Sequence, residues 1–269
     1  VELGGSLSGE HGIGLDKREA MAWLFAPQTL ALFRRLKKAL DPRDLANPDK
    51  LFPLETGKSG LGFCGPAARE LSAQARRLVA QVTGCAQSGR ALPVRRSRSR
   101  LDRQAQPDWA VLETSGMAGI VDLDTKNYTA TIEAGISVRL LHDELARQGC
   151  QVRLPDAGGT LGGLLATKPV AWLREDILGM RLLLADGSVC ELGGKVVKNV
   201  AGYDVPRMML GSWGALAVIL EVTMKLYAGP GKAAPLAVPS RPFYAGPWQR
   251  RVKQAFDPKN LLNPWLVPL

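Results

Sequence analysis

The most constraining feature of the sequence is an internal repeat whose two copies lie near opposite ends of the chain. Residues 34–48 are RRLKKALDPRDLANP and residues 250–264 are RRVKQAFDPKNLLNP, identical at nine of fifteen positions without a gap. Each copy indicates a basic amphipathic helix that stops before Asp-Pro and a turn at Asn-Pro, because proline disfavours helix in the preceding residue. Each is typical of a C-terminal tail, which indicates two gene ends brought together; chance similarity between two proline-terminated helices is the alternative.

Length and composition indicate a folded protein, since 46% of the 269 residues are hydrophobic and 22% are charged. No apolar run is long enough for a transmembrane helix, and the opening residues carry no secretory signal. The four cysteines lie far apart and match no zinc or iron–sulfur pattern. We therefore expect a protein of the reducing cytoplasm.

Charge and glycine are both unevenly distributed. Of the net charge of +10, half lies in residues 90–103, where six arginines face one acid. Such a cluster favours an anion, which could be a phosphate group, nucleic acid or an acidic partner. Eleven of the 29 glycines lie between Gly158 and Gly214.

The helical pattern predicts four segments. One helix is expected to begin near Asp16 and Glu19, and the next to run from Pro27 to Leu40 with the proline in its first turn. A third is expected from about residue 66 to 82 with Gly84 as its stop. Ser137 is expected to cap a fourth helix that continues to residue 148.

The strand pattern predicts an α+β fold, because strands and helices do not alternate regularly. Asp186-Gly187 between apolar runs predicts a β-hairpin over residues 178–192. Alternation over residues 218–226 predicts a half-buried strand. Further strands are expected at residues 109–112, 119–123 and 128–134.

The segment PDAGGTLGG at residues 155–163 is a candidate phosphate site. Its glycines permit close approach and the unusual φ values that a nest of backbone N–H groups requires. A tight connection without any ligand is the alternative, because a glycine-rich turn alone is a weak signal.

Four strings follow in order: REDILG (174–179), LADG (184–187), KNVAGYD (198–204) and GSWGALAVI (211–219). This series resembles the FAD-binding domain of the vanillyl-alcohol oxidase/p-cresol methylhydroxylase superfamily, in particular the E subunit of bacterial glycolate oxidase. The resemblance implies two α+β subdomains, here without the usual cap domain, since only about twenty residues lie where the cap is normally inserted.

The string SGEHGIG at residues 8–14 is similar to the C-terminal end of a different subunit, the D subunit of glycolate oxidase, and of related D-lactate dehydrogenases. That resemblance implies His11 as the catalytic base for a 2-hydroxy acid and Glu10 as a residue that helps to hold a metal. The upstream histidine string of that family is absent, so we predict no metal site. A loop histidine without a catalytic role is the alternative.

The resemblance also implies how FAD is held. Its pyrophosphate is expected beside an arginine-rich loop and the glycine-rich turn, and its rings against Thr167, Asp176 and the strand at Val218. In the loop, Arg and Ser replace the family's glycines, which weakens FAD binding, reroutes it through side chains or abolishes it. No histidine or cysteine in that loop offers a covalent link, so bound FAD is expected to be non-covalent. The expected contacts are Arg95, Ser97, Arg98, Ser99, Gly159, Thr160, Leu161, Gly162, Gly163, Thr167, Asp176, Val218 and Ile219.

These resemblances predict a division of the chain into five parts. They are a D-subunit-like segment (1–54), a linker (55–65), the FAD-binding domain (66–228), a second linker (229–247) and a C-terminal tail packed on that domain (248–269).

The predicted function is an FAD-binding subunit of a glycolate or D-lactate oxidoreductase complex. Hydride would pass from the 2-hydroxy acid to the flavin, and electrons would pass on to an iron–sulfur subunit, since this chain lacks cluster cysteines. Other glycolate oxidase-like subunits are the implied partners, with peripheral association at the inner membrane face through them. A non-catalytic scaffold or docking subunit is the alternative, whereas nucleic-acid binding lacks any supporting motif.

Overall fold

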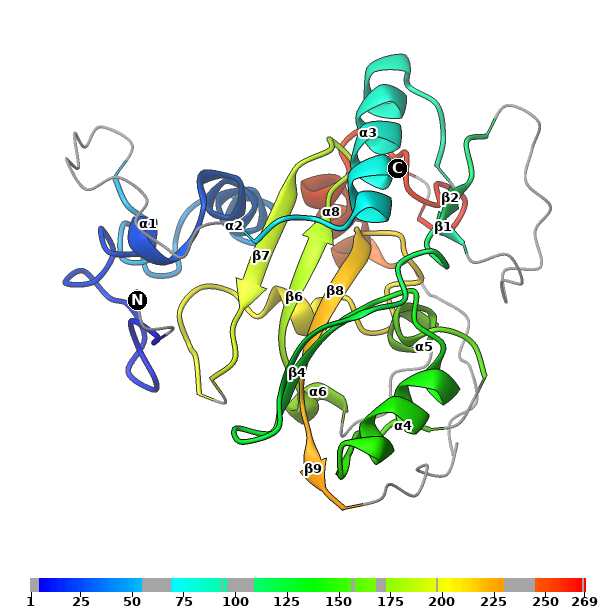
Figure 1. Ribbon diagram of the computed structural model, residues 1–269. Coiled ribbons are helices and arrows are strands. Elements are labelled where there is room, and N and C mark those ends of the chain that lie inside the picture. The colour runs from blue at the N-terminus through cyan, green and yellow to red at the C-terminus, as the bar shows by residue number, and fades with distance from the viewer. Residues whose placement is uncertain are drawn as a thin grey trace.

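The computed structural model describes residues 5–54, 69–92, 94–95, 109–155, 158–167, 173–196, 198–229, 245–267 and 269. Its centre is a five-stranded antiparallel sheet with helices around it, so the predicted α+β class is confirmed (Figure 1). The helices are α1 (Met21–Leu24), α2 (Pro27–Leu40), α3 (Ala73–Ser88), α4 (Val138–Arg147), α5 (Leu161–Thr167), α6 (Leu173–Asp176), α7 (Val205–Met208) and α8 (Pro247–Phe256). The strands are β1 (Val94–Arg95), β2 (Leu112–Glu113), β3 (Ile120–Asp124), β4 (Thr129–Glu133), β5 (Cys150–Gln151), β6 (Ile177–Leu183), β7 (Val189–Gly193), β8 (Val218–Lys225) and β9 (Tyr227–Ala228).

The main sheet has the strand order β3-β4-β8-β6-β7. The predicted hairpin is confirmed, with Leu183 opposite Val189 across β6 and β7. The prediction of a half-buried β8 is wrong, since nearly every residue of β8 is buried. The physical reason is its position between β4 and β6, where both faces of the strand are covered. Alternating polar residues in β8 are therefore paired inside the molecule.

Two hydrophobic clusters lie on the two faces of this sheet. One contains α3 together with Leu92, Leu112, Val218 and part of the C-terminal tail. The other contains residues of α2, α4, α5 and α8 with the opposite side of β6 and β8. The segments before and after the predicted flavin domain thus share its core.

The helix boundaries confirm some capping predictions and correct others. Ser137 caps α4 by accepting from Leu140 N at 3.1 Å, as predicted. The third helix begins and ends later in the chain than predicted. Ser72 caps α3, and Gly89, with φ of 70°, ends it. Gly84 stays inside the helix, because only the left-handed position at Gly89 requires glycine.

The N-terminal region differs from its prediction at one place only. Helix α2 has the expected bounds, with Pro27 in its first turn. No helix begins at Asp16, because residues 14–20 form turns and α1 starts at Met21 without a side-chain cap. The described helices include none that is both long and apolar enough to cross a membrane.

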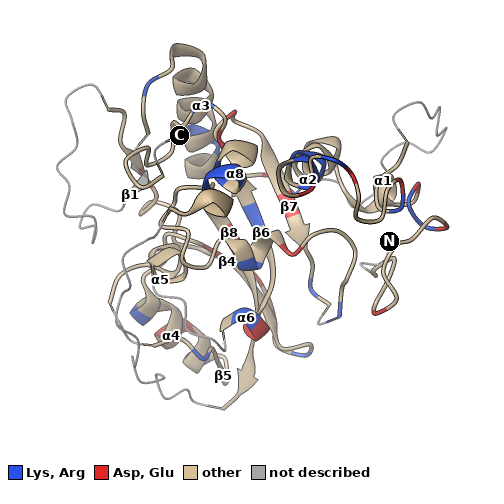
Figure 2. Ribbon diagram, turned by 180° about the vertical axis from the view of Figure 1, so that it is seen from behind, with Lys and Arg blue, Asp and Glu red and all other residues tan. Residues whose placement is uncertain are grey.

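The helices of the two repeat copies lie side by side. Helix α2 packs against α8, although more than 200 residues separate them. Figure 2 shows basic residues on both helices. The helices of the two repeat copies are therefore neighbours in the folded protein as well as similar in sequence.

Candidate functional site

The glycine-rich turn leads directly into α5. Gly158 and Gly159 are exposed with φ of 64° and 92°, whereas Thr160 is buried and pairs with Ser137. Such backbone angles suit glycine. Among the described residues, none has an atom within 4 Å of a Cβ built at Gly158, so they leave this end of the turn open.

Three amides of the same turn are already used inside the chain. Leu161 N donates to Ile136 O at 2.9 Å, and Gly162 N donates to Ala134 O at 2.7 Å. Gly163 N donates to the Thr160 hydroxyl at 3.2 Å. Part of the expected cradle is therefore already in use, because an anion that bound the amides of Leu161, Gly162 or Gly163 would displace a protein contact.

The arginine-rich loop is only partly described. Arg95 lies in β1, and its backbone is paired in parallel with Glu113 of β2. Ser97, Arg98 and Ser99 lie outside the described residues. Their contact with a pyrophosphate stays a prediction.

Asp176 is fully buried in a polar triad with Arg153 and Tyr227. Arg153 donates to its two oxygens at 2.9 and 2.5 Å, and the Tyr227 hydroxyl donates to Oδ1 at 2.6 Å. Burial, followed by the Asp176 carboxylate, raises the pKa of Tyr227 to about 12. No sequence signal marks Arg153 and Tyr227 as partners of Asp176, since it is the pairing of β5 with β9 that brings them to this carboxylate.

The other three predicted ring contacts lie in different surroundings. The Thr167 hydroxyl donates to Gly163 O at 2.7 Å in the last turn of α5. Val218 and Ile219 are buried and belong to the two different hydrophobic clusters. The structure therefore does not bring the side chains of this strand to one surface.

The loop with His11 packs against the loop that contains KNVAGYD. Lys198 Nζ pairs with Glu10 Oε1 at 2.8 Å, and Val200 N donates to Ser8 O at 3.1 Å. The Ser6 hydroxyl donates to Asn199 Oδ1 at 2.8 Å. The two motifs that resemble different subunits thus form one junction, with the His11 side chain exposed beside it.

An aromatic cluster holds the KNVAGYD loop in place. The Tyr203 ring makes edge-to-face contacts with Phe33 and Phe52, with centroids 5.7 and 5.9 Å apart. Gly202 has φ of 79°, and a Cβ there would lie 2.5 Å from the Phe33 ring. Helix α2 therefore positions this loop, a dependence that no local sequence signal could reveal.

The junction contains an unpaired polar atom but no metal cluster. The hydroxyl of Ser8 is buried and has no hydrogen-bond partner among the described residues. The same residues hold no group of three or more potential metal ligands. Glu10 is engaged by Lys198.

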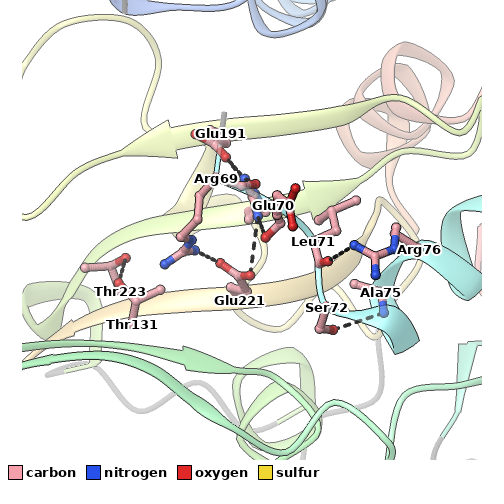
Figure 3. A network of polar contacts seen from close by, with 11 residues as sticks. Arg69, Glu70, Leu71, Ser72, Ala75, Arg76, Thr131, Glu191, Glu221 and Thr223 are labelled. Carbon is pink, nitrogen blue, oxygen red and sulfur yellow. Dashed lines mark hydrogen bonds and ion pairs between the residues drawn. The ribbon is translucent and has the colours of Figure 1, made fainter. Parts of the chain in front are cut away.

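A network of charged side chains fixes the start of α3 on the sheet, and Figure 3 shows Arg69, Glu191 and Glu221 within it. Arg181 of β6 donates to Glu191 at 2.7 Å and to Glu221 at 3.4 Å, and also to the carbonyl of Arg69. Arg69 pairs with Glu221 in turn. Burial raises the pKa of Glu221, against the lowering effect of the arginines. This network holds residues 69–72 across the sheet, so its role is structural.

Comparison with protein families explains these motifs. Residues 69–193 match the FAD binding domain model, and residues 1–51 with 247–267 match the model "FAD linked oxidases, C-terminal domain". Residues 69–193 are thus similar to FAD binding domains, and the two terminal segments are similar to the C-terminal domain of FAD-linked oxidases. FAD is the cofactor that these matches support, which confirms the prediction of a flavoprotein. The discontinuous second match contains both copies of the repeat.

Three curated relatives show the extent of the homology. The D-lactate dehydrogenase of Archaeoglobus fulgidus is 32% identical over 139 residues, covering 48% of this chain and 31% of the relative. Glycolate oxidase subunit GlcE of Escherichia coli is 32% identical over 123 residues, covering 42% and 35%. Glycolate oxidase subunit GlcD of Bacillus subtilis is 30% identical over 131 residues, covering 45% and 28%. The chain spans about a third of the length of these relatives.

Among solved structures, an alkyldihydroxyacetonephosphate synthase is similar with a TM-score of 0.49 at 22% identity, covering 57% of this chain and 30% of that one.

Proposed function

We propose that this chain is an FAD-binding subunit of a 2-hydroxy-acid oxidoreductase that acts on glycolate or D-lactate. The observation that carries the proposal is the junction between the His11 loop and the KNVAGYD loop, joined by the Glu10–Lys198 pair of 2.8 Å. This pair supports the proposal, because His11 directly follows Glu10 in the chain. The curated relatives, two glycolate oxidase subunits and a D-lactate dehydrogenase, support the substrate class.

The described residues suit a flavin in two respects. The open amides at Gly158 and Gly159 suit a phosphate, and the unpaired buried hydroxyl of Ser8 suits a polar ligand at the junction. We propose that Arg95 and Arg98 add charge on the pyrophosphate, in place of the glycines that other members use. Replacing both arginines by alanine is then expected to weaken FAD binding in a salt-dependent way.

The proposed chemistry needs a base and a carboxylate partner. When bound, FAD supplies the acceptor for a hydride. His11 takes the substrate hydroxyl proton, since an imidazole nitrogen can accept a proton and this side chain is exposed. Lys198 is mostly exposed, and its ammonium can leave Glu10 to hold the substrate carboxylate. The electrons would then pass to an iron–sulfur subunit of the same complex.

The absorption spectrum of the purified full chain tests the proposal. We expect a yellow protein, or quenching of flavin fluorescence when FAD is titrated in, and anaerobic bleaching by glycolate or D-lactate. A colourless protein that does not quench FAD would contradict flavin binding by this chain. A yellow protein that neither substrate bleaches would contradict the catalytic role.

A non-catalytic docking subunit is the second candidate. Two observations favour it: three amides of the glycine-rich turn are already paired, and Asp176 is saturated by Arg153 and Tyr227. In that case flavin binding, if retained, is not accompanied by bleaching. The same spectrum therefore distinguishes the two functions.

A further inference from the structure

Both copies of the repeat fold into the same hydrogen-bonded structure, which we call a clasp. In the first clasp (residues 37–50), Lys37 pairs with Asp41 and donates to Ala46 O at 2.8 Å. The Asp41 carboxylate accepts from Leu45 N at 3.0 Å and from Ala46 N at 2.8 Å. Asn47 then takes a positive φ of 49°.

The second clasp (residues 253–266) repeats each of these contacts 216 positions later. Lys253 pairs with Asp257 at 2.5 Å and donates to Leu262 O at 2.7 Å. The Asp257 carboxylate accepts from Leu261 N at 2.9 Å and from Leu262 N at 2.7 Å. Asn263 takes a φ of 44°. The two clasps are thus equivalent in backbone and side chains.

The second clasp is seated on the flavin domain through backbone groups. Lys253 donates to Ala215 O at 2.8 Å, and the Asn263 side chain donates to Trp213 O at 2.8 Å. Leu92 N donates to Leu261 O at 2.7 Å, and Asn263 N donates to Leu92 O at 3.2 Å. The receptor is therefore the GSWGALA turn and the strand end at Leu92.

The first clasp presents the equivalent surface to solvent. The side chains of Lys37 and Asp41 are 17% and 18% exposed, against 0% for both in the second clasp. Leu45 is 68% exposed, whereas its counterpart Leu261 is 3% exposed. Lys37 adds a pair with Asp44 at 2.7 Å, where the second clasp has the neutral Asn260. In the second clasp the Lys253 ammonium donates to Ala215 O, whereas in the first clasp the Lys37 ammonium pairs with Asp44 instead.

An open groove of about 440 Å³ lies beside the first clasp, lined by Lys37, Asp41, Phe52 and neighbouring residues. Its walls are both charged and apolar. A partner that supplies backbone carbonyls and an apolar contact fits this lining.

We propose that the first clasp is a docking element for a second FAD-binding domain, carried by a partner subunit, which presents the same kind of turn and strand end. A second copy of this chain does not fit, because its own turn is already filled by its second clasp, which acts at a high effective concentration. The partner's turn would take the place of Asp44 at Lys37 and pair with the backbone of Leu45. One chain thereby supplies two clasps: the second binds its own flavin domain, and the first binds the flavin domain of the partner subunit.

A mixing experiment tests the proposal. The donor is the full chain. The acceptor is the chain that lacks residues 247–269 and carries Asp41→Asn, so that its receptor turn is vacant and its own clasp is disabled. Circular dichroism checks that the acceptor is folded, and sedimentation velocity measures association. We expect a 1:1 complex.

Two matched variants identify the surface involved. A donor with Asp41→Asn is expected to bind the acceptor about tenfold more weakly or worse, because an amide nitrogen cannot accept from Ala46 N or from Lys37. A donor with Asp16→Asn, at an exposed position that does not line the groove, is expected to bind normally. A folded acceptor that fails to bind the full chain overturns the proposal. Equal affinity of the parent donor and the Asp41→Asn donor for the acceptor also overturns it.

If the acceptor does not fold, a chimera decides the question. Residues 250–264 of the full chain are replaced by the sequence of residues 34–48, except that Phe256 and Leu262 are kept because both are fully buried. Cooperative thermal unfolding within a few degrees of the parent shows that the first clasp seats on a flavin-domain turn, and supports the proposal. A chimera that is unfolded or melts far below the parent overturns it.

Discussion

Glu10 and Lys198 lie 188 positions apart, yet their side chains meet at 2.8 Å. The contact joins two short motifs whose residue types were recognised separately. Neither motif by itself defines a site, because a base needs a substrate surface and a substrate surface needs a base. At the scale of single residues, the proposed function therefore depends on this junction.

Replacing His11 by glutamine tests the proposed base. We expect the variant to bind FAD like the parent but to lose about 100-fold or more of the rate of flavin bleaching by glycolate or D-lactate, the usual contribution of general-base catalysis. Stopped-flow absorbance under anaerobic conditions measures the rate. His142→Gln is the matched control, since His142 lies on α4 and contacts Leu154 O at 3.2 Å. Equal rates for both variants would remove His11 from the mechanism.

Tyr227 is expected to make stability fall at high pH. Its pKa in the folded protein is raised from 10.0 to about 12, so the unfolded chain loses this proton first. The contribution is complete below pH 10 and is lost as the pH rises through about 12. Phenolate absorbance during alkaline titration checks this, and Tyr227→Phe should remove the late-titrating group. A normal titration of every tyrosine would show that the contact with Asp176 is not formed.

At the scale of elements, the sheet is held to its covering helix by charge as well as by apolar contact. Arg181, Glu191 and Glu221 lie on three neighbouring strands, in register. Residues 69–72 cross them and then become α3. The position of α3 is thus determined by side chains on strands that lie about 90 residues or more after it in the sequence.

Arg181→Met is expected to lower the free energy of unfolding by about 3–5 kcal/mol, because the buried Glu221 then relies on Arg69, whose side chain is 42% exposed. The raised pKa of Glu221 should rise further, so this loss is expected to be smaller at pH 5 than at pH 8. Urea unfolding at both pH values measures the effect. The double variant Arg181→Met with Glu221→Leu should recover much of the stability. A double variant as unstable as Arg181→Met would show that the arginine acts by packing alone.

At the scale of the whole molecule, the segments before and after the flavin domain both pack against it. The segment before the flavin domain contributes α2 and the aromatic contacts to Tyr203, and the segment after it contributes α8 and the second clasp. Both segments match the same C-terminal domain model. Of the two clasps, the second packs on the flavin domain, whereas the first remains partly exposed to solvent.

The two clasps allow the same substitution to be compared in two environments. Asp257→Asn is expected to lower the free energy of unfolding by about 3–5 kcal/mol, since it leaves the buried Lys253 ammonium without its counter-charge. Asp41→Asn is expected to have a much smaller effect, because Lys37 keeps Asp44 and contact with water. Thermal and urea unfolding measure both. Equal losses at the two sites would contradict the difference in burial.

Local structure was largely predictable from the sequence. Helix α2, the cap at Ser137 and the hairpin at Asp186-Gly187 all depend on residues within a few positions of one another, and each was correct. The end of α3 was not, because two glycines satisfied the same local rule and only one adopts the left-handed conformation. The resemblance of short motifs was likewise enough to indicate FAD.

Tertiary structure alone decided how these parts are used. The sequence determined that the repeat exists twice and that each copy is a proline-stopped basic helix with a turn. It could not determine which copy is buried, since that depends on whether the carbonyls of Trp213 and Ala215 lie opposite its lysine and asparagine. It also could not pair Glu10 with Lys198, or Asp176 with Tyr227, because such contacts join residues that are distant in the chain and close only after the sheet has formed.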